Sequence, residues 1–267
     1  MKPTLIKPLV AALALGASVP AALAAISYQY RMPVPGLTVN AVVTPSTPQV
    51  PSLVGDGVST VGGCTSGATG CATWNPTDRT SATTLSADNL VVQLPNRTIA
   101  GGIRATVGKT TGKWYWELTI RSTGANNFGS LEPIYSEIGV LPLQAAISER
   151  ICNNAGLGYA WFTYAWTTND YRSVKCKDSY SGYVPYGSPV YVNGDVIGVL
   201  LDMDSHTLEY SKNGVRQGVA FTGITARAYY PGVTKDANMK NLMVVEANFG
   251  QANFQYPVPA GFNAGLW

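Results

Sequence analysis

Residues 113–120 read Lys-Trp-Tyr-Trp-Glu-Leu-Thr-Ile, and this stretch decides the fold class. Large apolar residues alternate with polar ones along it, which is typical of a β-strand whose side chains point alternately to two faces. Trp114 and Trp116 are therefore expected on one face of the strand, with Tyr115 and Glu117 on the other.

Other short stretches along the second half of the chain also indicate strands. Residues 196–203 indicate a buried strand, residues 207–211 and 244–249 indicate two more, and Asn213-Gly214 marks a hairpin turn. Only residues 143–151 carry a pattern that fits a helix, and a short one. Many short strands separated by Gly and Asn turns predict an all-β protein built as an antiparallel sandwich.

The composition of the 267 residues supports this fold class and limits the function. Charged residues make up only 12%, whereas Gly (28), Pro (17) and Tyr (15) are frequent. Coiled coils, helical bundles and acidic disordered tails need many more charges. A net charge of +3 is too small for a protein that follows a phosphate backbone, so no nucleic-acid partner is expected.

The first residues have the features of an export signal. Lys2 and Lys7 precede the uncharged apolar stretch 8–24, which ends in small residues around Ala24. These features predict a signal peptide over 1–24 and a secreted or cell-surface protein, with a retained membrane anchor as the alternative. No other membrane contact is expected.

Residues 25–84 differ from the rest because they are rich in Pro, Gly, Ser, Thr and Val and nearly free of charge up to residue 77. We interpret them as an extended N-terminal segment with a small stapled loop. The segment is either a linker or an assembly element, with residues 26–60 adding a strand to a neighbour.

The chain has four cysteines, an even number that favours disulfides in an exported protein. Three pairings are possible. The local pairing is Cys64–Cys71 and Cys152–Cys176, and it closes the shortest loops. No cysteine pair has the C-x₂-C spacing of a zinc site, so no metal and no cofactor are expected.

Several short motifs occur in a fixed order along residues 85–260. They are Gly-Lys-Trp-Tyr-Trp-Glu at 112–117, Ile-Gly-Val at 138–140, Gly-Asp-Val-Ile-Gly at 194–198, Asn-Gly at 213–214 with Gly218 and Ala-Phe at 220–221, Tyr-Pro-Gly-Val at 230–233, Glu-Ala-Asn-Phe-Gly at 246–250 and Phe-Gln-Tyr-Pro at 254–257. In this order they resemble the SPRY (B30.2-like) domain, here placed at residues 85–267.

The resemblance implies a bent two-sheet antiparallel β-sandwich, similar to the concanavalin architecture. It also implies a binding module, because members of the family present edge loops to a peptide or protein and are not enzymes. The known relatives act inside cells, so an export signal and disulfides set this chain apart and leave its partner open.

An aromatic stretch between residues 156 and 193 holds the candidate binding residues. Tyr159, Trp161 and Phe162 are expected in the core, whereas the residues after Thr163 are expected in loops. Exposed Tyr, Trp and Arg side chains dominate protein-binding hot spots, and aromatic rings also stack on sugars. The candidates are Tyr164, Trp166, Asn169, Asp170, Tyr171, Arg172, Tyr180, Tyr183 and Tyr186.

The sequence offers no catalytic constellation. His206 is the single histidine, and the Ser205 beside it lacks a nucleophile-elbow motif. Asp202, Asp204 and Glu209 lack the pattern of a glycosidase pair. We therefore expect a non-enzymatic recognition protein with a protein or peptide ligand. The alternatives are a glycan-binding module of an adhesin, appendage or virion, and a structural subunit that self-assembles through its N-terminal segment.

Overall fold

The computed structural model describes residues 70–95, 101–122, 136–153, 157–167, 170–177, 183–187, 190–235 and 242–267. The predicted signal peptide and nearly all of the predicted N-terminal segment lie outside these ranges. None of the described helices is long and apolar enough to cross a membrane.

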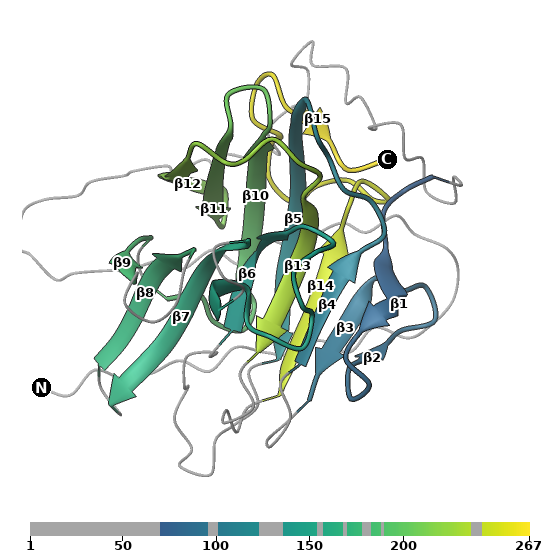
Figure 1. The fold of residues 1–267 in the computed structure, drawn as a ribbon, viewed down its shortest axis with the longest axis vertical. Helices are drawn as coiled ribbons and strands as arrows, with labels where there is room; N and C mark the ends of the chain where they lie inside the picture. Colours follow the sequence, from purple (N-terminus) through teal and green to yellow (C-terminus); the bar gives the residue numbers. More distant parts are fainter. Residues whose placement is uncertain are drawn as a thin grey trace, which may run out of the picture. The chain divides into compact units, whose positions relative to one another are not determined.

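Two antiparallel sheets form the described part of the chain (Figure 1). The first sheet has, in spatial order, β1 (Trp74–Arg79), β4 (Gly101–Ala105), β13 (Tyr230–Lys235), β6 (Ser136–Leu141), β7 (Tyr159–Thr167), β8 (Asp170–Cys176) and β9 (Val184–Pro185). The second has β12 (Val215–Thr222), β11 (Thr207–Lys212), β10 (Val196–Asp202), β5 (Lys113–Ser122), β14 (Met243–Asn248), β3 (Val91–Leu94) and β2 (Thr84–Leu85). A short strand, β15 (Asn263–Ala264), lies parallel to β5. The predicted all-β sandwich is confirmed.

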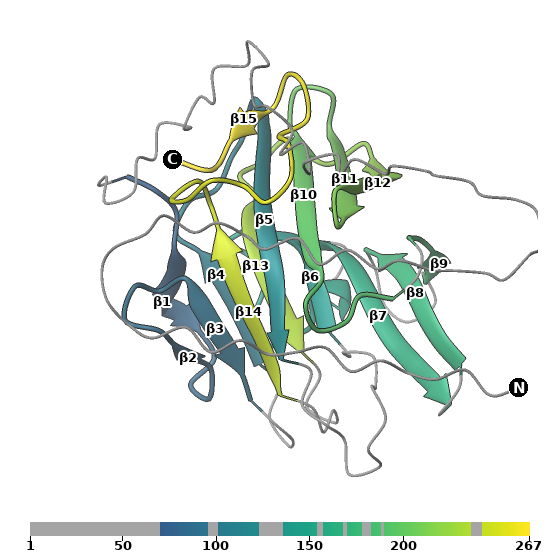
Figure 2. The same cartoon turned by 180° about the vertical axis from the view of Figure 1, so that it is seen from behind.

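The main core lies between the sheets, which form two layers in Figures 1 and 2. Trp116 of the second sheet and Trp161 of the first are both fully buried in it. Trp114 is half-buried and packs against the same core, so the two tryptophans share a face as the alternation predicted. Tyr115 and Glu117 are also buried, on the other face.

The centre of the second sheet explains why a glycine occupies position 198. Gly198 pairs with Glu117 of β5 and with Ser211 of β11. A Cβ atom on this glycine would lie 2.3 Å from the Ser211 Oγ and 2.7 Å from the Tyr115 ring. Position 198 therefore has no room for a side chain.

The predicted hairpin turn joins β11 to β12. Asn213 and Gly214 both have positive φ angles, of 50° and 78°. Two-residue hairpins with this conformation favour Asn-Gly, because their twist matches that of the flanking strands.

Two sequence interpretations need correction. The expected helix at 143–151 is replaced by turns up to residue 150, and the one described helix is the short 3-10 helix η1 (Ile151–Asn153). The sandwich also begins before residue 85, because β1 pairs with β4 and Trp74 is fully buried in the core.

Candidate functional site

Five of the nine candidate binding residues lie in strands rather than in the expected loops. Tyr164 and Trp166 belong to β7, and Asp170, Tyr171 and Arg172 belong to β8. The two strands pair directly, with Tyr164 opposite Arg172 and Ala165 opposite Tyr171. The loop assignment was wrong because the pairing of β7 with β8 continues up to Asp170.

Two further candidates, Asn169 and Tyr180, lie outside the described residues. The side chains of residues 164–172 do as well, so the contribution of these candidates to binding stays a prediction.

Tyr186 belongs to the core rather than to a binding surface, which corrects the sequence interpretation. Its ring is 8% exposed and packs edge-on against Trp161. Its hydroxyl donates a hydrogen bond to the Gly218 carbonyl at 2.6 Å and accepts one from the Tyr210 amide at 3.2 Å. Burial raises the pKa of this phenol well above its usual value, so Tyr186 stays neutral.

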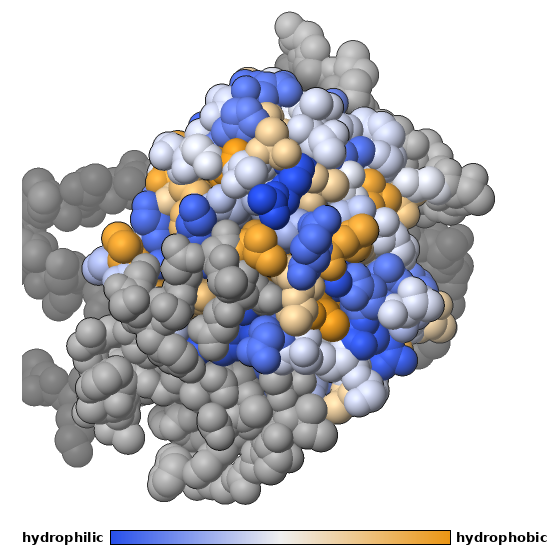
Figure 3. Space-filling view, in the orientation of Figure 1, coloured by the Kyte–Doolittle hydropathy of each residue, from blue (hydrophilic) through white to orange (hydrophobic). Residues whose placement is uncertain are grey.

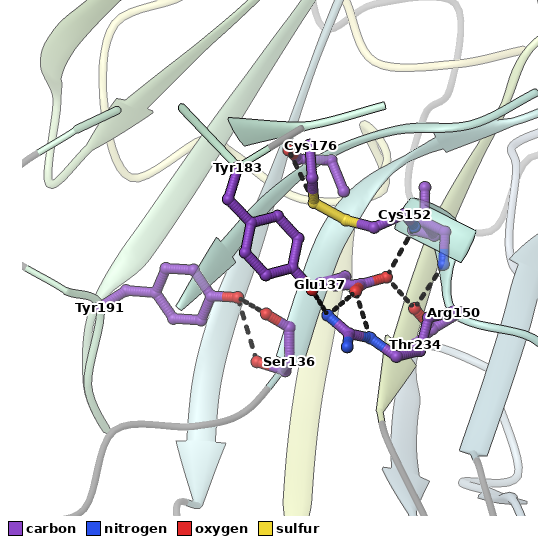
Figure 4. A network of polar contacts seen from close by, with 10 residues as sticks. Ser136, Glu137, Arg150, Cys152, Cys176, Tyr183, Tyr191 and Thr234 are labelled. Carbon is purple, nitrogen blue, oxygen red and sulfur yellow. Dashed lines mark hydrogen bonds and ion pairs between the residues drawn. A yellow bond between two sulfur atoms is a disulfide. The ribbon is translucent and has the colours of Figure 1, made fainter. Parts of the chain in front are cut away.

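Tyr183 is half-buried and belongs to a polar network on the outer face of the first sheet (Figure 4). Its hydroxyl accepts a hydrogen bond from Arg150 Nη2 at 3.0 Å, and its ring lies 5.5 Å from that of Phe162. Tyr183 therefore helps to cover the face of β7 and is only partly available to a partner.

The centre of this network is Glu137, which is 1% exposed. One carboxylate oxygen accepts a hydrogen bond from Arg150 Nε, and the other accepts from the Cys152 amide and the Thr234 hydroxyl. Cys152 is joined by a disulfide to Cys176 of β8, as the sequence predicted. Together these bonds fix the turn at residues 150–153 to the outer face of the sheet (Figure 4).

Only one cysteine of the second predicted disulfide lies among the described residues. Cys71 is disulfide-bonded. Its expected partner, Cys64, lies outside the described residues.

No metal-ligand set is available in this network as it stands. Glu137, Cys152 and Cys176 lie close enough to share an ion. However, the disulfide occupies both sulfur atoms, and the carboxylate is already hydrogen-bonded by its neighbours.

A hollow of about 200 Å³ lies on the outer face of the second sheet, beside Thr119 and Asn248. Its charged groups are engaged: Arg121 pairs with Glu246, and Glu117 accepts the amides of Gln255 and Tyr256. Among the described residues that line the hollow, no charged group is left unpaired.

The exposed apolar side chains are concentrated at one end of the sandwich. Five large apolar residues are conspicuously exposed among those described, and three of them lie on β9 and β12: Val184 (49%), Val215 (65%) and Val219 (49%). These strands are the last of the first sheet and the first of the second. Figure 3 shows apolar atoms at the surface over both strands.

Two bonds between the sheets bring β9 and β12 together. Tyr186, which follows β9, donates its hydroxyl to Gly218 of β12. Lys175 of β8 pairs in register with Val184 and reaches the Ala220 carbonyl. We call the surface at this end of the sandwich the edge surface. It comprises Lys175, Lys177, Val184, Pro185, Val215, Arg216, Val219 and Phe221.

The charge on the edge surface is positive. Arg216 pairs with the buried Glu209, and this hydrogen bond raises the pKa of the guanidinium above its usual value. The charges of this pair cancel. Lys175 and Lys177 are left over, so the edge surface carries two uncompensated positive charges among the described residues.

The sequence interpretation did not identify the edge surface. The run Val-Arg-Gln-Gly-Val at 215–219 after a hairpin turn was a usable signal. Alternation alone, however, does not show that this strand ends a sheet, so its valines could equally have been core residues.

Comparison with known proteins now identifies the family. A model of the SPRY domain matches residues 113–251, more than half of the chain. The chain is 32% identical over 191 residues to Ran-binding protein 10 of Danio rerio, covering 69% of this chain and 28% of that protein. It is 30% identical over 151 residues to the E3 ubiquitin-protein ligase RKP of Arabidopsis thaliana, covering 55% of this chain and 10% of that protein.

The chain thus corresponds to a small part of these curated relatives, 28% of one and 10% of the other. Among solved structures, the SPRY domain of human HERC1 has a TM-score of 0.50 at 17% identity and covers 65% of this chain and 96% of that one. This likeness supports the two-sheet fold. The motifs, the sandwich and the family match agree, and the chain belongs to the SPRY domain family.

Proposed function

We propose that this protein is an exported, non-enzymatic recognition module that binds a protein or peptide partner through the edge surface. The observation that carries the proposal is the grouping of exposed Val184, Val215 and Val219 on neighbouring edge strands. Apolar side chains grouped at a surface mark an interaction site more often than scattered ones do. Family membership supports the role, since SPRY domains generally act as protein-interaction modules.

The β7–β8 hairpin is part of the proposal. Its candidate residues Trp166, Tyr171 and Arg172 lie in strands of the same sheet as β9. We propose that these side chains extend the contact beyond the valines, because aromatic and Arg residues contribute most to binding energy at interfaces.

Export is also proposed. The apolar stretch at residues 8–24 and the Cys152–Cys176 disulfide support it, because disulfides persist in oxidising compartments. Expression of the full chain with its own N-terminus, followed by N-terminal sequencing of the exported product, tests this step. The expected first residue is Ala25, and a product that retains Met1 inside the cell would contradict it.

Binding to cell surfaces tests the function. The labelled full-length protein is added to candidate cells that are untreated, protease-shaved or periodate-treated. We expect shaving alone to abolish binding. Loss after periodate alone would instead support the glycan-binding alternative, and no binding to any cell would favour a structural subunit.

Matched variants test the surface. Val184→Asn with Val219→Asn removes apolar area without adding charge and should weaken binding at least about tenfold, as expected when interface anchors are truncated. Leu143→Asn is the control, because Leu143 is equally apolar and 57% exposed but lies outside the edge surface. An equal loss with the control would contradict the assignment of binding to the edge surface.

A further inference from the structure

The edge surface contains two lysines that no described carboxylate neutralises. The Lys175 ammonium donates to the Ala220 carbonyl and lies 5.6 Å from the centre of the Phe221 ring. The Lys177 side chain is exposed, and its ammonium lies 5.4 Å from the centre of the Tyr159 ring. Neither lysine forms an ion pair within the described part of the chain.

The two ammonium groups lie beside neighbouring aromatic rings. The Phe221 and Tyr159 rings beneath them are 5.1 Å apart and pack edge-on. An acidic group that approaches this pair of rings is attracted by both charges. Lys175 is half-buried and therefore partly shielded from water, and charge pairs are stronger where water is excluded.

An apolar side chain borders one of these charges. Val184 lies directly opposite Lys175 in the β8–β9 pair, so the two side chains share a face of the sheet. Val219 pairs with Glu209, so its side chain lies on the outer face of the second sheet, beside Arg216 rather than beside Lys175. A ligand that neutralises Lys175 therefore also covers Val184.

We propose that the partner presents a carboxylate flanked by apolar side chains, as in a protein segment with Asp or Glu next to Val, Leu, Ile or Phe. This inference rests on the proposed function and specifies the chemistry of the ligand. Val184 takes the apolar side chains and the lysines take the carboxylate.

A peptide fits these features better than a polyanion does. Two free lysines are few for a sulfated glycan or a nucleic acid, whose affinity grows with the number of neutralised charges. The exposed valines would have no role in binding such a ligand.

Selection from a random peptide library displayed on phage tests the proposal. The bait is the immobilised full-length protein, and the most enriched sequences are then made as synthetic peptides. We expect enrichment of Asp and Glu beside apolar residues over the unselected library. Binding should weaken about threefold with Lys175→Gln or Lys177→Gln and about tenfold with both, as for partly exposed charge pairs. Arg121→Gln, which removes a charge on β5, should have no effect.

The outcomes separate this inference from the proposed function. Peptides that lack acidic residues, or that bind the double lysine variant as well as the native protein, would overturn the inference. The proposed function would stand in that case if Val184→Asn with Val219→Asn still abolished peptide binding. If no peptide is enriched, or if the valine variant binds normally, both proposals fail. Tight heparin binding that the double lysine variant loses would reassign the lysines to a polyanion.

Discussion

Arg150 Nε lies 2.6 Å from Glu137 Oε1, and both side chains are almost completely buried on the outer face of the first sheet. Removing one partner of a buried pair leaves a charge without compensation. We predict that Arg150→Met lowers the free energy of unfolding by about 3 kcal/mol or more, measured by urea denaturation.

The control for this prediction is the pair Arg121–Glu246, whose side chains are 55% and 41% exposed. Arg121→Met should cost less than about 1 kcal/mol, since exposed pairs contribute little. Equal losses for the two variants would show that burial does not set the value of the Glu137 pair.

The Cys152–Cys176 disulfide closes a loop with a sequence separation of 24 residues. Its replacement by Cys152→Ala with Cys176→Ala should lower the free energy of unfolding by about 2–4 kcal/mol, because the unfolded chain gains conformational freedom. Denaturation with and without a reductant measures the effect. The variant should still lose stability when the reductant is added, because Cys71 also forms a disulfide. A variant whose denaturation midpoint without reductant equals that of the native protein would contradict the prediction.

The buried position of Tyr186 predicts a structural role for its hydroxyl. Tyr186→Phe removes the bond to Gly218 and leaves the Tyr210 amide without this acceptor, which should cost about 1–2 kcal/mol of stability. Partner binding at a temperature where the variant is folded should change little. Weaker binding with unchanged stability would return Tyr186 to the contact residues.

The buried phenols predict a loss of stability in alkali. Burial raises the pKa of Tyr191 and Tyr210 above the usual value, and burial together with Tyr159 raises the pKa of Tyr229 to about 12. A pKa that is higher in the folded than in the unfolded state adds to the free energy of unfolding. This contribution is complete below the unfolded value of about 10 and is lost as the pH rises through the folded value.

The free energy of unfolding should therefore fall above about pH 10, the usual pKa of tyrosine. Tyr229→Phe should make this fall less steep. Ultraviolet absorbance of phenolate, recorded beside circular dichroism, checks both points. Ionisation of every tyrosine near pH 10 in a still-folded protein would contradict them.

Much of the fold was predictable because strand alternation is a local property. Residues 113–120 carry an alternating pattern and residues 196–203 an almost continuous apolar run in their own sequence, and the structure places both in the centre of one sheet. Strand β1 was missed because Trp74 is followed by Asn, Pro, Thr, Asp and Arg, so a single buried tryptophan carries the packing.

The candidate site was less predictable because exposure depends on contacts between distant segments. Tyr186 resembles a surface tyrosine in sequence, but Gly218 lies 32 residues away and its carbonyl binds the hydroxyl in the core. Val184 and Val219 resemble core residues, yet their strands end the two sheets and leave them in solvent. Neither the burial of Tyr186 nor the exposure of the two valines can be inferred from the local sequence.

The bonds from Tyr186 and Lys175 to β12 also affect how the folded chain behaves at high concentration. Unsatisfied carbonyls on an outermost strand can recruit the backbone of another molecule and start aggregation. The carbonyls of Gly218 and Ala220 are already taken by side chains of the same molecule. These two carbonyls of β12 are therefore closed to the backbone of another copy of the chain, while Val215 and Val219 of the same strand stay exposed to a partner.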